Sequence, residues 1–204
     1  MKKDLEILNN NDEENDFLTQ TPNHKKPIVL MGDSITEFWK ANNESFFSSN
    51  NFINKGISGQ TTPQMLLRFR QDVINLTPSK VVILAGINDI AENTGPITLE
   101  AIFENIVSMA ELAKTNKIKV VLCAVIPSNA FYWNAKIQPA DKVIALNKMI
   151  NAYATINKIP YVDYYTAMVD TNKGLEKKYG DDGVHPNRNG YKLMESLLLK
   201  VLNN

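Results

Sequence analysis

One serine and one histidine, each close to an aspartate and a glycine, are the residues most suited to chemistry in this chain. Ser34 follows Gly32 and Asp33 at the end of the apolar run Ile28 to Met31. An apolar run that stops at glycine and is followed by helical residues is typical of a buried strand that leads into a helix. Ser34 is then expected at the carboxyl edge of a sheet, where open α/β sheets bind ligands. Its hydroxyl can act as a nucleophile if a base reaches it.

His185 is the candidate for that base. The other histidine, His24, lies among turn residues and lysines near the N-terminus and is not expected to be catalytic. Asp182 precedes His185 by three residues, so in a turn its carboxylate can fold back onto the imidazole and fix the tautomer. Asp181 is the alternative acid, although the spacing favours Asp182. An imidazole can take and return a proton near neutral pH, as catalysis by a serine requires.

Acyl transfer at a serine also needs hydrogen-bond donors for the oxyanion of the tetrahedral intermediate. Two glycine-containing loops follow other predicted strands, at residues 56–59 and 86–89. They converge with Ser34 if the strands are parallel. Glycine N–H groups in these loops and the amide of Asn88 can donate, and only one of Gly56 and Gly59 is needed. Asp89 is interpreted as structural.

Apolar strands that alternate with helices must position these loops. Strands are predicted at residues 28–31, 51–54, 80–84, 120–125 and 160–163, with the short second strand possible at an edge. Helices are predicted at residues 36–42, after Pro63, from Thr98, at 140–157 and from about Asn187. Such alternation implies parallel pairing with right-handed crossovers. The expected fold is an α/β/α three-layer sandwich with a central, mainly parallel five-stranded sheet. On the helix after Pro63, Arg68 and Arg70 are expected on a solvated or salt-bridged face.

The composition suits one globular domain without excess charge. The 204 residues are expected to form a polar N-terminal arm (1–26) and one domain (27–204). Lys and Arg together number 22, as do Asp and Glu, and the formal net charge is +0. This balance does not favour nucleic acid or an anionic membrane surface as a partner.

Neither a metal site nor a targeting segment is expected. The histidines and the single cysteine, Cys123, match no metal-ligand spacing. Cys123 lies in an apolar run, which predicts a buried thiol. No apolar segment follows Met1-Lys2-Lys3 as in a signal peptide, and no run is long enough to span a membrane. We therefore expect a cytoplasmic protein, although an exported protein trimmed from a longer precursor would have a similar start.

Four short blocks together resemble the SGNH/GDSL hydrolase family, from about Ile28 to the C-terminus. The blocks are Gly32-Asp33-Ser34, a second-block glycine at Gly59, Gly86-Ile87-Asn88-Asp89 and Asp182-Gly183-Val184-His185. Ile35 stands where the name-giving motif often has leucine. Within the family, the chain is similar to the branch related to platelet-activating-factor acetylhydrolases.

The resemblance implies a flavodoxin-like SGNH hydrolase fold and a role for each matching residue. Ser34 would be the nucleophile, His185 the base and Asp182 the acid that orients the base. The oxyanion hole would consist of the backbone N–H groups of Ser34 and Gly59 and the side-chain amide of Asn88. Family members usually need no metal, and no cofactor is expected.

The expected activity is that of a serine esterase that cleaves a carboxylic ester through an acyl-enzyme. The acyl group is expected to be short, such as acetyl, on a sugar or lipid. Asp33 and the aromatic residues Phe131, Tyr132 and Trp133 of the long loop 127–139 are candidates for the substrate pocket. The alternatives are a non-catalytic glycan- or lipid-binding module on the same fold and a flavodoxin-like nucleotide binder. A monomer and a homodimer are both compatible with the sequence.

Overall fold

The computed structural model describes residues 26–203. Apart from Lys26, the predicted N-terminal arm lies outside the described residues, and so does His24. Within the described part of the chain, no helix combines the length and the apolar character needed to cross a bilayer.

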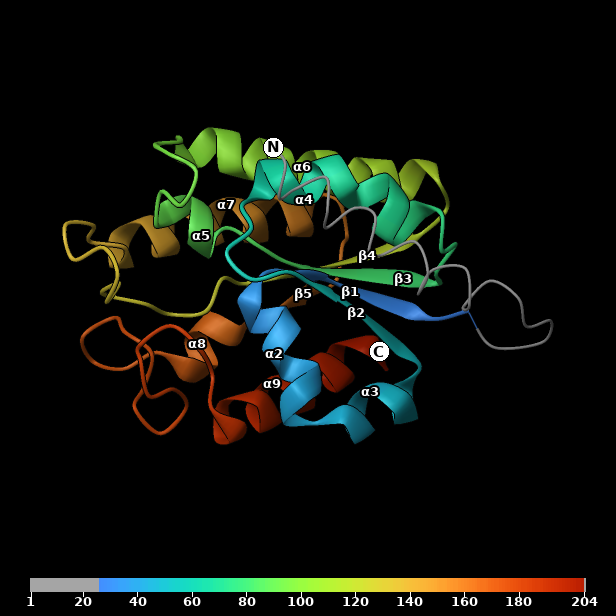
Figure 1. Ribbon diagram of the computed structural model, residues 1–204. Helices are drawn as coiled ribbons and strands as arrows, with labels where there is room; N and C mark the ends of the chain where they lie inside the picture. The colour runs from blue at the N-terminus through green and yellow to red at the C-terminus, as the bar shows by residue number, and fades with distance from the viewer. Residues whose placement is uncertain (1–25, 204) are drawn as a thin grey trace.

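Five parallel strands form the centre of the molecule (Figure 1). They are β1 (Ile28–Gly32), β2 (Phe52–Gly56), β3 (Lys80–Leu84), β4 (Lys119–Cys123) and β5 (Tyr161–Val162). The strand order is β2-β1-β3-β4-β5, and every pair is parallel. Gly32 at the end of β1 lies opposite both Gly56 and Leu84, so the loops that follow these three strands leave the sheet side by side.

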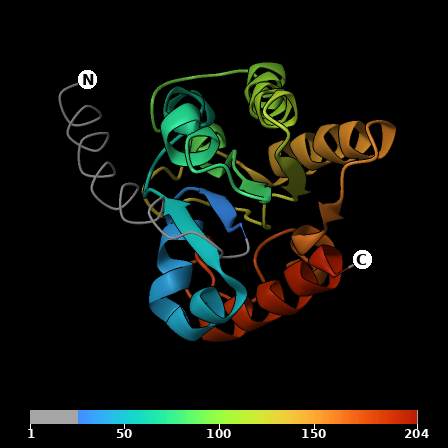
Figure 2. The same cartoon turned by 90° about the vertical axis from the view of Figure 1, so that its right-hand side faces the viewer.

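Helices cover both faces of the sheet, as the two ribbon views show (Figures 1 and 2). One face carries α4 (Thr62–Phe69), α5 (Ile87–Ile90), α6 (Leu99–Thr115) and α7 (Ala140–Ile156). The other carries α2 (Ser34–Asn42), α3 (Glu44–Asn50), α8 (Tyr164–Met168) and α9 (Arg188–Leu202). A π-helical turn, η1 (Arg70–Ile74), extends α4. The predicted three-layer sandwich with a five-stranded sheet is confirmed, and all its strands are parallel.

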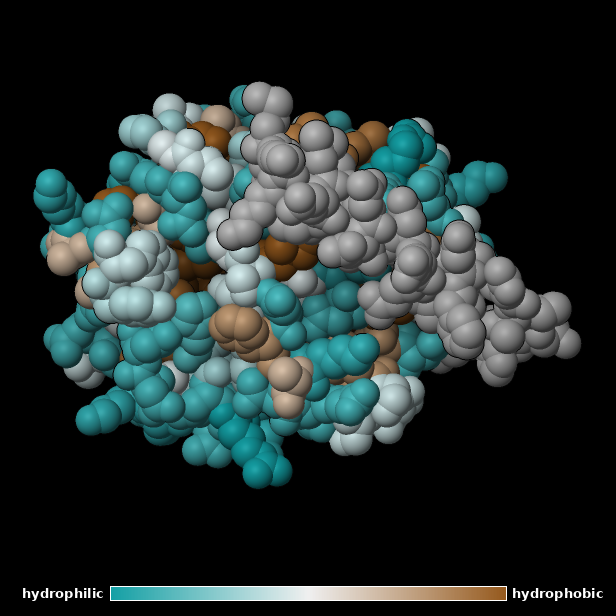
Figure 3. Space-filling model, in the orientation of Figure 1, coloured by the Kyte–Doolittle hydropathy of each residue, from teal (hydrophilic) through white to brown (hydrophobic). Residues whose placement is uncertain are grey.

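The core consists of the strand side chains and the apolar faces of the helices. On the α2 side, Trp39 is the centre of an aromatic cluster, whose other members are Phe46, Phe47, Tyr164 and Tyr191. These rings join α2 to α3, α8 and α9. Cys123 is buried as predicted, and burial raises the pKa of its thiol to about 12. Outside the core, the face in Figure 3 is mostly hydrophilic, with hydrophobic side chains in small areas.

Arg68 is salt-bridged, one of the two expected situations, but its side chain is buried and not on a surface, whereas Arg70 is exposed. Its guanidinium pairs with Asp72 one helical turn later, at 2.7 Å. The remaining bonds of Arg68 are to the Gln60 side chain and to the carbonyls of Gly32 and Lys55. These partners come from the ends of β1 and β2 and from the loop after β2. One buried cation therefore holds the carboxyl ends of two neighbouring strands.

Asp33 caps α2 and is also buried, with 1% of its surface exposed. Its Oδ1 accepts the N–H of Ile35 at 3.0 Å, and α2 consequently begins at Ser34, two residues before the predicted start. The other carboxyl oxygen, Oδ2, is buried and has no hydrogen-bond partner. Burial raises the pKa of Asp33 to about 7, although the hydrogen bond from Ile35 and the nearby His185 oppose this shift.

Replacing Asp72 with alanine should lower the free energy of unfolding by about 3–5 kcal/mol, because Arg68 would remain buried without its carboxylate. Chemical denaturation of the two proteins measures this difference. Asp141→Ala is the matched control, since it removes an exposed carboxylate paired with Lys173 and should change stability little. Similar small losses in both variants would show that the backbone carbonyls and the Gln60 side chain suffice to satisfy Arg68.

Asp33→Asn should flatten part of the pH dependence of stability. Between the ordinary pKa near 3.8 and the native value of about 7, native Asp33 binds more protons than unfolded Asp33. Its contribution to the free energy of unfolding is therefore fully present below about pH 4 and decreases as the pH rises to about 7. Asparagine is a good helix cap that does not titrate. Denaturation of both proteins across this range tests the prediction, which parallel pH profiles would contradict.

Candidate active site

Ser34 is the first residue of α2 and directly follows β1 and the capping residue Asp33. The N–H of the first residue of a helix has no intrahelical acceptor, and the helix dipole favours negative charge at this end. The Ser34 side chain is largely buried, with 7% of its surface exposed, and it lines a cleft at the carboxyl edge of the sheet. The strand-to-helix turn therefore presents both a hydroxyl and a backbone donor.

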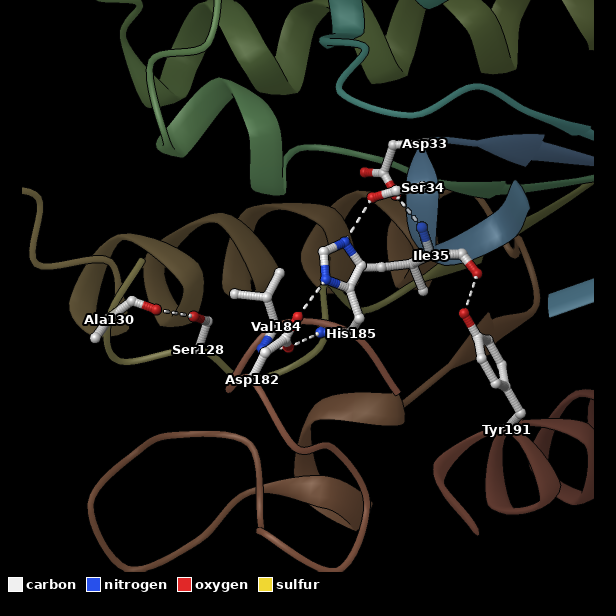
Figure 4. Close-up of polar contacts among 9 residues, drawn as sticks. All are labelled: Asp33, Ser34, Ile35, Ser128, Ala130, Asp182, Val184, His185 and Tyr191. Carbon is white, nitrogen blue, oxygen red and sulfur yellow. Dashed lines mark hydrogen bonds and ion pairs between the residues drawn. The ribbon is translucent and has the colours of Figure 1, made fainter. Parts of the chain in front are cut away.

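His185 lies next to this hydroxyl although it is 151 residues away in the sequence (Figure 4). Ser34 Oγ and His185 Nε2 are 2.9 Å apart, within hydrogen-bond distance. On the other side of the ring, Nδ1 lies 2.7 Å from Asp182 Oδ2. The predicted serine, histidine and aspartate thus form a continuous hydrogen-bonded chain. Asp181 takes no part in it, so the geometry favours Asp182 as the acid.

The Asp182 carboxylate is held by the backbone of its own turn. Its Oδ1 accepts the N–H groups of Val184 and His185 at 2.8 and 2.7 Å, while Oδ2 faces the imidazole. Partial burial alone would raise the pKa of Asp182, but the hydrogen bonds from His185 and Val184 outweigh it and lower this pKa. Asp182 is therefore a stable anion beside the ring, suited to stabilising an imidazolium.

Contacts between the last helix and α2 bring this turn to the serine. Tyr191, on α9, donates its hydroxyl hydrogen to the carbonyl oxygen of Ile35 at 2.9 Å (Figure 4). The Phe38 ring, one helical turn after Ser34, packs 5.5 Å from the His185 ring between centroids. Both contacts join the His185 segment to the helix that carries the nucleophile.

Gly56 and Gly59 have different structural environments, which separates their possible roles. A Cβ on Gly56 would lie 2.1 Å from the backbone nitrogen of Glu37, so this position allows α2 to pack on the end of β2. Gly59 has a φ of +77° and lines the cleft, and a Cβ added there would approach only Asn93 Nδ2, at 4.0 Å. The geometry therefore favours Gly59 as the backbone donor of this loop.

Asn88 and Asp89 hold the loop after β3 against the segment that follows β2. Asn88 lines the cleft, and its Nδ2 donates one hydrogen to the carbonyl of Gln60 at 3.1 Å. The buried Asp89 carboxylate accepts both the N–H and the hydroxyl of Thr62, at the start of α4. Asp89 consequently has the structural role expected from the sequence, and Asn88 has a second hydrogen available for a ligand.

The cleft around Ser34 has a volume of about 570 Å³. It is lined by Ser34, Phe38, Ser58, Gly59, Asn88, Asn93, Tyr132, Trp133, Asp182 and His185. Five large hydrophobic side chains are exposed among residues 26–203, and Phe38, Tyr132 and Trp133 at the cleft are three of them. Such a concentration of exposed rings is typical of a binding surface.

Two pocket predictions are not matched by the structure. Phe131 is 1% exposed and stacks under Trp133, with 5.0 Å between ring centroids, so it supports the cleft from the core. Asp33 is buried as the cap of α2 and does not line the cleft either. Of the three consecutive aromatic residues, Tyr132 and Trp133 alone line the cleft.

Sequence reasoning did not identify three lining residues, Phe38, Ser58 and Asn93. Phe38 could have been found, because it lies four residues after Ser34 and therefore on the same face of the helix. Ser58 adjoins Gly59 in the predicted loop. No feature of the sequence places Asn93 at the site, since the shape of the turn between Asn88 and Asn93 cannot be predicted from these residues.

A second cavity in the structure contains none of the predicted catalytic or pocket residues. A cavity of about 730 Å³ lies at the opposite edge of the sheet, near the first residues of β3 and β4, Lys80 and Lys119. Within the described part of the chain, no group of three His, Cys, Asp or Glu side chains is arranged to hold a metal ion.

Comparison with known proteins agrees with this geometry. The model of the GDSL-like lipase/acylhydrolase family matches residues 30–193, which include every residue of the hydrogen-bonded chain at Ser34. A curated relative, lipoprotein YqeF of Bacillus subtilis, is uncharacterized and is 28% identical over 143 residues. That match covers 60% of this chain and 58% of the lipoprotein.

Two solved structures are similar over almost the whole chain. A GDSL-like lipase from Bacteroides thetaiotaomicron has a TM-score of 0.93 and 49% identity, covering 96% of this chain and 97% of its own. A candidate acylhydrolase from Bacteroides fragilis has a TM-score of 0.91 and 50% identity, covering 94% and 93%. The chain belongs to the GDSL-like lipase/acylhydrolase family and is a hydrolase of carboxylic esters.

Proposed function

We propose that this protein is a serine esterase that removes a short acyl group, such as acetyl, from a sugar or lipid alcohol through an acyl-enzyme. The observation that carries the proposal is the hydrogen-bonded chain from Ser34 through His185 to Asp182, which opens into the cleft. Nucleophile, base and orienting acid are already at hydrogen-bond distances, as acyl transfer requires.

In the first half of the reaction, Ser34 Oγ attacks the ester carbonyl carbon while His185 Nε2 takes the hydroxyl proton. The carbonyl oxygen becomes an oxyanion, for which the N–H groups of Ser34 and Gly59 and the Asn88 amide are the donors. The carbon–oxygen bond to the alcohol then breaks, and the alcohol leaves with the proton held by His185. Asp182 stabilises the imidazolium throughout.

In the second half, water replaces the alcohol. His185 removes a proton from the water, and the resulting hydroxide adds to the acyl carbon under the same three donors. Collapse of this intermediate returns the proton to Ser34 Oγ and releases the carboxylic acid. Each step uses groups that line the cleft, and water is the one co-reactant of the ester.

The lining of the cleft supports a short acyl group. None of its lining residues is aliphatic, and Ser58, Asn88 and Asn93 are polar. A long acyl chain laid over these polar side chains would deprive them of water, a cost that a short acyl group avoids. The exposed rings of Tyr132 and Trp133 suit the alcohol portion, because an aromatic face packs well on a sugar ring or an apolar stem.

The two non-enzymatic alternatives have less support. A binding module on this fold would not need Ser34 at 2.9 Å from an imidazole that is itself oriented by a carboxylate. A flavodoxin-like nucleotide binder would share the strand order of this sheet. The corresponding edge here instead carries the serine, the histidine and the donors for an oxyanion.

Ser34→Ala should reduce hydrolysis of p-nitrophenyl acetate by a factor on the order of 10⁴ or more, because it removes the nucleophile. Ser49→Ala, an exposed serine on α3, is the matched control and should behave like the wild type. Wild-type turnover should fall from acetate to butyrate to octanoate esters, and acetate release from acetylated sugars extends the test to natural-type alcohols. Equal rates in Ser34→Ala and wild type would refute the serine mechanism, and a preference for octanoate would refute the short acyl group.

Asp182→Asn should lower turnover roughly 10³- to 10⁴-fold, because an amide at this position cannot stabilise the imidazolium or enforce the tautomer. Asp181→Asn changes the adjacent exposed carboxylate in the same way and should leave turnover close to that of the wild type. Steady-state kinetics of the two variants decide between the acids. Greater damage from Asp181→Asn would show that Asp181 orients the base.

A further inference from the structure

Asn93 lines the cleft but lies outside all four sequence blocks. Its side chain contacts two different loops of the site. Nδ2 donates to Asn88 Oδ1 at 2.9 Å and to the carbonyl oxygen of Gly59 at 3.3 Å. The Asn93 backbone is fixed as well, because its N–H donates to the Asn88 carbonyl at 3.1 Å. A single amide thus joins the two loops that carry the candidate oxyanion donors.

The contacts with Asn93 and Gln60 together determine which way the Asn88 amide points. Asn88 Oδ1 accepts from Asn93, while Asn88 Nδ2 donates to the Gln60 carbonyl at 3.1 Å. Only one of the two orientations of the amide satisfies both bonds, since the reversed one would place nitrogen against nitrogen and oxygen against oxygen. In the observed orientation, the bond to Gln60 uses one hydrogen of Nδ2, and Asn88, which lines the cleft, retains a second hydrogen as a donor for the oxyanion.

The turn that contains Gly59 is held from two sides. Glu37, on α2, accepts the N–H of Ser58 at 2.7 Å and also its hydroxyl. Asn93 donates to the Gly59 carbonyl from the other loop. Gly59 itself has a left-handed backbone, in a turn closed by the hydrogen bond from the N–H of Gln60 to the carbonyl of Ile57, at 3.3 Å. The two side chains hold this turn in place relative to α2 and to the loop of Asn88, and so help to fix the direction of the Gly59 N–H.

We propose that Asn93 is a positioning residue of the oxyanion hole, which orients the Asn88 amide and fixes Gly59 relative to it. This inference rests on the proposed esterase function. Asn93 acts before the substrate arrives: it gives the donors their transition-state geometry in the free enzyme. Preorganised donors stabilise charge without reorganising during the reaction, so their alignment affects turnover more than ground-state binding.

Asn93→Ala should lower kcat for p-nitrophenyl acetate roughly 5- to 30-fold with KM nearly unchanged, because the donors remain but lose their alignment. Asn93→Asp should be more damaging. A carboxylate cannot donate to Asn88 Oδ1 or to the Gly59 carbonyl, and it favours the reversed Asn88 amide with its oxygen toward the oxyanion. Asn151→Ala, an exposed asparagine on α7, is the control and should match the wild type.

A double-mutant cycle with Asn88→Ala separates positioning from general damage to the structure. If Asn93 acts through Asn88, adding Asn93→Ala to Asn88→Ala should cause much less loss than Asn93→Ala causes alone, with only the Gly59 contribution remaining. Losses that multiply in full would refute this coupling, as would an Asn93→Ala variant with wild-type kcat. A rise in KM at constant kcat would make Asn93 a substrate-binding residue instead.

Labelling with a fluorophosphonate distinguishes failure of this inference from failure of the proposed function. The wild type should be phosphonylated at Ser34, and Asn93→Ala should react more slowly, since the phosphonyl oxygen uses the same donors. A wild type that neither hydrolyses esters nor reacts with the probe refutes the proposed function and this inference together. An active wild type whose Asn93 variants react at the same rate refutes the inference alone.

Discussion

The buried guanidinium of Arg68 is the interaction on which the geometry of the site most depends. It joins the carbonyl of Gly32, the carbonyl of Lys55 and the side chain of Gln60, and Asp72 balances its charge. Gly32 precedes the nucleophile by two residues, and Gln60 follows the glycine of the second loop directly. A planar group with several donors can hold such diverging acceptors at once, which a lysine ammonium cannot do as rigidly. Arg68, buried beneath the cleft, therefore helps to set the distance between the nucleophile and the oxyanion donors of the second loop.

Much of the fold could be predicted because the strands are continuous apolar runs and the long helices have clear spacing. Alternation of the two left few arrangements other than a parallel sheet with helices on both faces. The short elements α3, α5 and α8 and the π-helical turn η1 were not predicted, since segments of four to seven residues contain too few turns for a period to appear. The Arg68–Asp72 pair has helical spacing, but burial of Arg68 was not predictable, because its other partners are two backbone carbonyls and the Gln60 side chain, all outside its own helix.

In the site, contacts between residues close in the sequence could be predicted, whereas contacts between distant segments could not. Asp182 and His185 interact within one turn, so their spacing alone predicted the pair. The role of Phe131 was mispredicted, because consecutive aromatic residues give no indication of which ring packs inward. That choice depends on the stacking of Phe131 with Trp133 and on the core below them. Asn93 was missed because the path of the chain after α5 decides whether its side chain meets Gly59.

The turn of residues 182–185 makes the acid–base pair insensitive to small structural shifts elsewhere in the molecule. Asp182 binds the backbone of Val184 and His185 as well as the imidazole ring, so acid and base form one self-contained unit. The remaining alignment is a single long-range distance, from His185 Nε2 to Ser34 Oγ. Small displacements elsewhere in the molecule can disturb these three residues chiefly through that contact, whereas the oxyanion donors depend on the separate contacts of their own loops. Substitutions on the exposed helix surfaces should therefore leave the chain from Ser34 to Asp182 intact as long as α9 stays docked against α2.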